Sequence, residues 1–169
     1  VATLSAHNPG WDDRWDEFSQ WADRGLELET ELLHLVDEDT EAFNRIMAAF
    51  GMPKNTEEDK RLRSEAIQSA TLFAAQVPLE TMKTSFKAFE ICKAMAETGN
   101  PNSVSDAGVG ALAARAAVLG AGLNVKINAS SLKDKAVADG LVAEAEELMK
   151  DADAAEREIM TIVENTIKK

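Results

Sequence analysis

The chain has 169 residues, of which 45% are apolar and 28% are charged, and thirty Asp and Glu outnumber eighteen Lys and Arg to give a net charge of -12. This length is typical of one domain and is sufficient for a hydrophobic core without disulfides or a structural metal. The acid excess argues against nucleic-acid and membrane-surface partners, because both are bound by clustered cations.

The N-terminus lacks the basic and apolar regions of a signal peptide, and no stretch approaches the roughly 20 consecutive apolar residues of a spanning helix. We therefore expect a cytoplasmic protein. Cys92 is the only cysteine, and His7 and His34 are the only histidines. The sequence thus predicts no internal disulfide and no metal site, and Cys92 is expected to be packed in a helix.

Ala, Leu, Glu, Lys and Met recur at helical spacing along most of the chain, and only the short run 124–128 shows β-branched alternation. These patterns predict an all-α fold, an up-and-down bundle of several helices forming a single domain over residues 1–169.

Residues 1–6 have the pattern of the last turns of a helix whose beginning is absent. A stripe of aromatic residues at helical spacing follows and is expected to pack in the core: Trp11, Trp15, Phe18 and Trp21.

The next predicted helix, residues 26–50, carries a carboxylate on its apolar stripe. Asp39 lies at the centre of six apolar residues that project within about 40° of one direction: Leu28, Leu32, Leu35, Phe43, Ile46 and Phe50. A core-facing carboxylate must be hydrogen-bonded, paired with a cation, or kept protonated. The first two roles are structural, whereas the third, in a cleft, describes a general acid or base. Asp37 points to nearly the opposite side.

A third helix is expected to begin at the cap Asn55–Thr56 and to run to Gly99, with a kink at Pro78. Beyond it, residues 107–125 contain one charge, Arg115, among many Ala and Gly. Such a helix has almost no polar face, so we expect it to be central and buried. The last helix, residues 137–167, is amphipathic and is expected to pack along the bundle or against a second subunit.

Polar side chains flank both ends of the predicted central helix. Asn100, Asn102, Ser105 and Asp106 precede it, and they either cap the helix or bind a ligand. Asn124, Lys126 and Asn128 lie near its end, where they either satisfy neighbouring helix ends or hold a polar ligand.

Three segments in this order resemble one known family: LVDEDTEAF at 35–43, QVPLE at 76–80, and GNPNSVSDAGVGALAARAAVLGAGLNVKIN at 99–128. They are similar to the formiminotransferase-cyclodeaminase C-terminal family, which includes stand-alone bacterial methenyltetrahydrofolate cyclohydrolases. The resemblance implies a dimerising helical bundle with its active site near the subunit contact. It also implies a tetrahydrofolate derivative as substrate, with no metal or other cofactor.

The resemblance also assigns roles to residues. The family's acidic motif matches 37–39, and the helical projection favours Asp39 for proton transfer, with Asp37 as the competing choice. The polar residues Asn100 to Asp106 are expected to bind the pterin, with Asp106 at its amidine-like edge. A cation near the substrate's glutamate tail is expected from one of three residues: Arg115, Lys126 or Lys133.

One departure from the family is the start of the chain. The family begins with a Gly-rich segment and an Ala-rich helix, whereas this chain opens at Val1 inside that helix, so part of the site is expected to be missing. Three hypotheses follow: a cyclodeaminase that closes 5-formiminotetrahydrofolate to 5,10-methenyltetrahydrofolate with release of ammonia, a cyclohydrolase of the same fold, or a non-catalytic dimerisation module.

Overall fold

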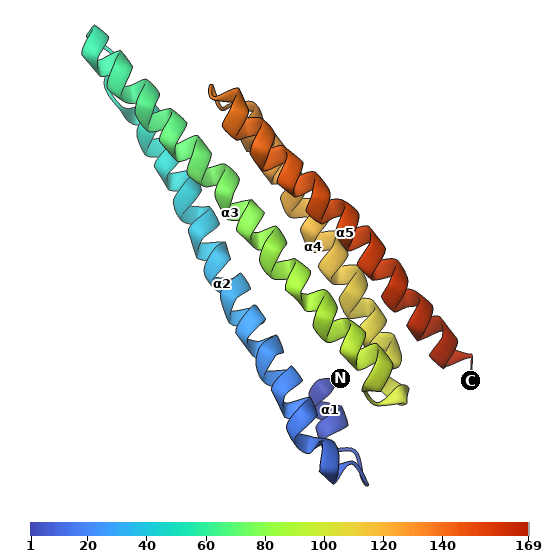
Figure 1. The fold of residues 1–169 in the computed structure, drawn as a ribbon. Helices are drawn as coiled ribbons and strands as arrows, with labels where there is room; N and C mark the ends of the chain where they lie inside the picture. Colours follow the sequence, from blue (N-terminus) through green and yellow to red (C-terminus); the bar gives the residue numbers. More distant parts are fainter. Residues whose placement is uncertain (169) are drawn as a thin grey trace.

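A computed structural model describes residues 1–168. Four long helices run alternately up and down (Figure 1): α2 (Trp15–Gly51), α3 (Glu57–Thr98), α4 (Val104–Ser130) and α5 (Lys135–Ile167). A short helix α1 (Ala2–Ala6) and two 3-10 turns, Asp12–Arg14 and Pro101–Ser103, complete the described range, which contains no strand. The all-α, up-and-down bundle predicted from the sequence is confirmed.

Two helices extend further than their predicted bounds. The segment 26–50 lies in one continuous helix, α2, with Trp15, Phe18 and Trp21, because Gly25 does not interrupt it, whereas Trp11 precedes the helix. Residues 124–128, which alternate like a strand, lie inside α4. Phe18 is fully buried as predicted, but Trp15 is half exposed, so the expectation that it packs in the core is wrong.

The start of α3 is fixed by reciprocal hydrogen bonds. Thr56 Oγ1 accepts from the backbone N–H of Asp59, and the Asp59 carboxylate accepts from the N–H of Thr56, each at 3.0 Å. This capping box satisfies two backbone donors that the first helical turn leaves unpaired. The helix then passes through Pro78 without ending, as predicted.

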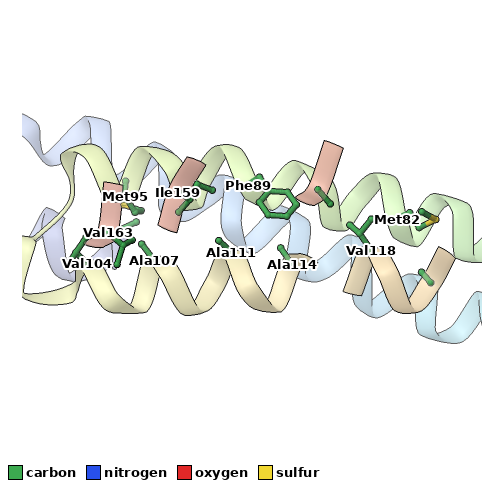
Figure 2. Close-up of a cluster of buried hydrophobic side chains, with 14 of the residues drawn as sticks. Met82, Phe89, Met95, Val104, Ala107, Ala111, Ala114, Val118, Ile159 and Val163 are labelled. Atoms are coloured by element: carbon green, nitrogen blue, oxygen red, sulfur yellow. The ribbon is translucent and has the colours of Figure 1, made fainter. Parts of the chain in front are cut away.

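The main core lies between α3, α4 and α5. Figure 2 shows Phe89 of α3 beside the small side chains Ala111 and Ala114 of α4, with Met82 further along α3 near Val118. Small residues allow this close approach: a Cβ on Gly110 would lie 3.0 Å from Cys92 Sγ. Cys92 packs against this core, as expected, and burial raises the pKa of its thiol.

The expectation that α4 is enclosed by other helices is wrong for the single chain. One face packs on α3 and α5, but the other is open and apolar, with Ile127 67% exposed. We call this face the α4 stripe: Val109, Leu112, Ala116, Leu123 and Ile127. The side chains of α4 are too uniformly apolar and small for the sequence to show which face is left uncovered.

Within residues 1–168, the segment Pro101–Ser130 is long and apolar enough to cross a membrane, with a mean hydropathy of 1.4. Arg115 interrupts this segment, so it does not contradict the expectation, which concerned about 20 consecutive apolar residues. Core helices of soluble proteins meet the same criterion, and α4 packs one face against α3 and α5.

Candidate active site between α2, α3 and α4

A pocket of about 380 Å³ opens where the middle of α2 faces α3 around Pro78 and the second half of α4. Its volume lies within the usual range for small-molecule sites. Three helices line it: Leu32, Leu35, Val36, Asp39 and Thr40 from α2, Pro78 and Thr81 from α3, and Ala117, Ala121 and Asn124 from α4. All three segments that carry the family resemblance therefore contribute to one concave surface.

Asp39 lies in this pocket but is not buried in the core. Its side chain is exposed and forms no hydrogen bond or ion pair with another residue of 1–168. The prediction of a core-facing carboxylate is therefore wrong. The buried side of α2 follows Leu35, Ala42 and Ala49, whereas Phe43, which the helical projection placed on the same stripe, is 62% exposed.

The competing carboxylate, Asp37, is also exposed but does not line the pocket. Its neighbour Glu38 lies 3.5 Å from His34 Nε2, one turn earlier on the surface of α2. Of the acidic motif 37–39, the pocket thus includes only Asp39. This arrangement favours Asp39 over Asp37 for chemistry in the pocket.

Asn128 of α4 binds the backbone of α3 one turn before Pro78. Because proline has no backbone N–H, Pro78 cannot donate to the carbonyl of Ala74, four residues earlier. Asn128 Nδ2 donates to this Ala74 oxygen at 2.7 Å. Of the two roles considered from the sequence, Asn128 therefore has the structural one: its amide nitrogen donates to a neighbouring helix.

Asn124, one turn before Asn128, lines the pocket with an exposed side chain. Its amide forms no hydrogen bond to residues 1–168, so both its donor and its acceptor can meet a ligand. Lys126 faces α5 instead, where its Nζ lies 2.9 Å from Glu146. The three polar residues at the end of α4 therefore have different roles. Asn124 lines the pocket, Lys126 forms an ion pair with Glu146, and Asn128 donates to the Ala74 carbonyl of α3.

The polar residues before α4 lie far from this pocket in the same chain. Asn100 Oδ1 accepts from the N–H of Asn102 at 3.0 Å and so caps the turn 101–103. Asn102, Ser105 and Asp106 are exposed. Ala117, which lines the pocket, follows Asp106 by eleven residues, or about 17 Å of helix. One chain therefore does not bring Asp106 and Asp39 together.

Two hydroxyl groups near the pocket were not identified from the sequence. Thr81 lines it and donates from Oγ1 to the Val77 carbonyl at 3.1 Å, which leaves its oxygen free to accept. Ser85, one turn later on α3, is 3% exposed, and its Oγ has no hydrogen-bond partner within residues 1–168. Isolated Ser and Thr in a helix carry no signal that separates them from structural residues.

Two of the three cations expected near an anionic tail already form ion pairs within the chain. Arg115 pairs with Asp153 and Lys126 with Glu146. Lys133 forms no ion pair within residues 1–168 and donates from Nζ to Ser64 Oγ at 2.6 Å. No group of three His, Cys, Asp or Glu side chains is placed to bind a metal in this part of the chain.

Comparison with known proteins gives consistent results. The family described as Formiminotransferase-cyclodeaminase matches residues 1–147. A methenyltetrahydrofolate cyclohydrolase of Methylorubrum extorquens is 36% identical over 89% of this chain and 73% of its own length. A formimidoyltransferase-cyclodeaminase of Dictyostelium discoideum is 35% identical over 75% of this chain, which spans 23% of that protein.

The fold also matches a solved structure. The formiminotetrahydrofolate cyclodeaminase of Thermotoga maritima superposes with a TM-score of 0.83 over 99% of this chain and 79% of its own, at 24% identity. This likeness shows a shared helical architecture. Because the family match covers most of the sequence and the cyclohydrolase aligns over most of both proteins, the chain belongs to the formiminotransferase-cyclodeaminase family.

Proposed function

We propose that the chain is a formimidoyltetrahydrofolate cyclodeaminase, which converts 5-formiminotetrahydrofolate to 5,10-methenyltetrahydrofolate and ammonia. The observation that carries the proposal is the pocket in which Asp39, Pro78 and Asn124 meet, because each comes from a different segment of the family resemblance. The family's own description and the names of the bifunctional relatives support this reaction.

The reaction requires a group that moves one proton. N10 of the folate attacks the carbon of the protonated formimino group (–CH=NH2+) and forms a C–N10 bond while the C=N double bond becomes a single bond, giving a tetrahedral centre that carries an amino group. N10 then loses its proton, the amino group gains one, and the bond from carbon to that amino group breaks to release ammonia. A single carboxylate can accept the first proton and return the second, and we assign this role to Asp39.

The other pocket residues provide polar contacts on either side of Asp39. Asn124 can donate to a carbonyl or ring nitrogen of the pterin and accept from its N–H groups. Thr81 offers an acceptor, because its own proton is used within α3. Each step moves a proton rather than an electron, so the proposal includes no cofactor, and the tetrahydrofolate derivative is the substrate.

We further propose that a second copy of the chain completes the site. Asp106 and Asn124 are eighteen residues apart, which at about 100° per residue is five full turns, so both project in the same direction from α4. By the same spacing the residues of the α4 stripe project about 60° to 120° from this direction, so the stripe lies beside these two residues on α4. A two-fold, antiparallel contact centred near Ala116 would bring Asp106 of one subunit close to Asn124 of the other.

A second candidate function is methenyltetrahydrofolate cyclohydrolase. The Methylorubrum extorquens relative favours it, because that protein aligns over 89% of this chain and most of its own length. In this reaction water adds to the methenyl carbon and loses a proton to leave a hydroxyl group. The bond from carbon to N5 then breaks as N5 gains a proton, and the hydroxyl loses its proton as the formyl C=O forms, so one proton is released overall. The product is 10-formyltetrahydrofolate, and Asp39 could again carry the proton.

One pair of assays tests both candidates. The purified chain is mixed with 5-formiminotetrahydrofolate, and methenyl formation is followed by its ultraviolet absorbance; methenyl hydrolysis is followed at the same wavelength in a second cell. The cyclodeaminase proposal predicts enzyme-dependent formation of the methenyl compound. Accelerated hydrolysis without formation from the formimino compound would identify the cyclohydrolase, and no acceleration of either reaction would refute both.

A further inference from the structure

Cations gather around a second pocket, at the end of the bundle where the α2–α3 turn extends past the α4–α5 turn, which lies beside the first turns of α3 (Figure 1). This pocket has a volume of about 390 Å³. We call it the basic pocket, and its polar lining consists of Lys54, Lys60, Arg63, Ser64, Gln68 and Lys133. No carboxylate lines it, although acids outnumber bases thirty to eighteen in the whole sequence.

Most cations of residues 1–168 are neutralised by a neighbouring acid, but those of the basic pocket largely are not. Lys60 pairs with Glu57, whereas Lys54, Arg63 and Lys133 form no ion pair in this part of the chain. The only other cations there without one are Lys135, which donates to the carbonyl of Leu132, and Lys150 on α5. The charges left without a counter-charge are thus concentrated at one place.

Neutral groups hold two of these cations in position. Lys133 donates from Nζ to Ser64 Oγ at 2.6 Å and from its backbone N–H to Gln68 Oε1 at 2.7 Å. Arg63 donates to the Phe50 carbonyl at 3.2 Å, with its guanidinium 5.6 Å from the Phe50 ring centroid. These contacts fix the side chains without cancelling their charge, so the field in the pocket remains positive.

We propose that the basic pocket binds a multiply charged anion of the carboxylate or phosphate class. Carboxylates and phosphates form charge-assisted hydrogen bonds with Lys and Arg that are stronger than neutral ones. Several converging cations select a ligand with more than one negative charge over a simple monovalent ion. Because the pocket is open to solvent, binding weakens as ionic strength rises.

Two sources can supply this chemistry. One is a free anion such as a polyphosphate. The other, which rests on the proposed function, is the carboxylate tail of a folate substrate. Gln68 precedes Pro78 by ten residues, so the basic pocket lies about 15 Å along α3 from the pocket that contains Asp39. An extended ligand bound at Asp39 with its tail toward the turns would direct its carboxylates at Arg63 and Lys133.

Direct titration tests the site. Tripolyphosphate and γ-linked triglutamate are titrated calorimetrically into the full chain and into two variants that each remove one unpaired cation, Lys133→Gln and the control Lys150→Gln. We expect at least one probe to bind, with Kd about tenfold weaker in Lys133→Gln, the loss expected for one charge-assisted contact, and unchanged in Lys150→Gln. Failure of both probes to bind, or equal binding by both variants, would overturn the proposal.

A kinetic comparison distinguishes the two sources. If the tail is the ligand, a folate substrate with three γ-glutamates has a lower KM than one with a single glutamate, and Lys133→Gln removes this advantage. If the ligand is a free anion, tripolyphosphate binds and KM does not depend on tail length. Probe binding requires no turnover, so a chain that binds them but converts no folate refutes the proposed function and supports the site.

Discussion

Asn128 of α4 donates a hydrogen bond of 2.7 Å to the carbonyl of Ala74 in α3, the acceptor that Pro78 leaves unpaired. Since Pro78 and Asn124 both line the pocket of Asp39, this contact joins its two walls one turn from the site. The hydrogen bond that Pro78 cannot make within α3 is therefore replaced by one from α4.

Loss of this contact should cost stability in a way that depends on Pro78. Asn128→Ala leaves a buried carbonyl without a donor, and we expect it to lower the free energy of unfolding by about 1 to 3 kcal/mol. In a Pro78→Ala background the restored N–H can reach Ala74, so the same substitution should cost less. Urea unfolding of the parent, the two single variants and the double variant gives the cost of Asn128→Ala in each background. Equal costs would show that Asn128 does not replace the hydrogen bond that Pro78 cannot make.

The cap of α3 predicts a pH dependence. Hydrogen bonds from the Thr56 backbone and side chain lower the pKa of Asp59. A carboxylate with a lowered pKa stabilises the fold at neutral pH, and this contribution is lost as the pH falls through its folded pKa. Asp59→Ala should therefore be less stable than the parent at neutral pH, with a difference that narrows in acid. Asp151→Ala, which removes an exposed acid of α5 that caps no helix, is the control and should show no such narrowing.

Removal of the Thr56 hydroxyl should weaken the same cap. Thr56→Ala loses the acceptor for the Asp59 N–H, and we expect it to cost about 1 kcal/mol. Thermal unfolding followed by circular dichroism measures the change. A melting temperature equal to that of the parent would mean that the capping box contributes nothing in solution.

The α4 stripe predicts self-association. Leu123 is 65% exposed at the end of this apolar surface, so Leu123→Glu should convert a dimer to a monomer without loss of helix content. Leu62→Glu changes a leucine that is 42% exposed on α3, outside the stripe, and should leave the dimer intact. Sedimentation velocity measures the mass of each, and a monomeric parent chain would contradict the dimer proposal.

A site shared between subunits also allows complementation. If Asp39 of one subunit acts with Asp106 of the other, Asp39→Asn and Asp106→Asn are each inactive, but a mixture of the two forms mixed dimers with one intact site. After random exchange of subunits, activity should recover to about a quarter of the parent value. No recovery, despite exchange confirmed by mass, would place both residues in the same subunit's site or remove one of them from it.

The fold could be predicted from local sequence signals. The helical spacing of apolar residues, the cap at Thr56 and the resumption of that spacing after Pro78 are all set by residues close together in the sequence. The site follows less directly. The three resemblance segments do meet in one pocket, but the exposure of Asp39 depends on how α2 packs on α3, which no local pattern encodes. The engagement of Asn128 with Ala74 and the lack of a partner for Ser85 are also set by the packing of α3.

The central claim is that Asp39 carries the proton in the pocket between α2, α3 and α4. Its most direct test is the turnover of Asp39→Asn beside Asp37→Asn, the same chemical change two residues away and outside the pocket, with both folds verified by circular dichroism. We predict that Asp39→Asn lowers kcat at least about a hundredfold, as expected for loss of a general acid or base, whereas Asp37→Asn remains close to the parent. Normal turnover by Asp39→Asn would contradict the account.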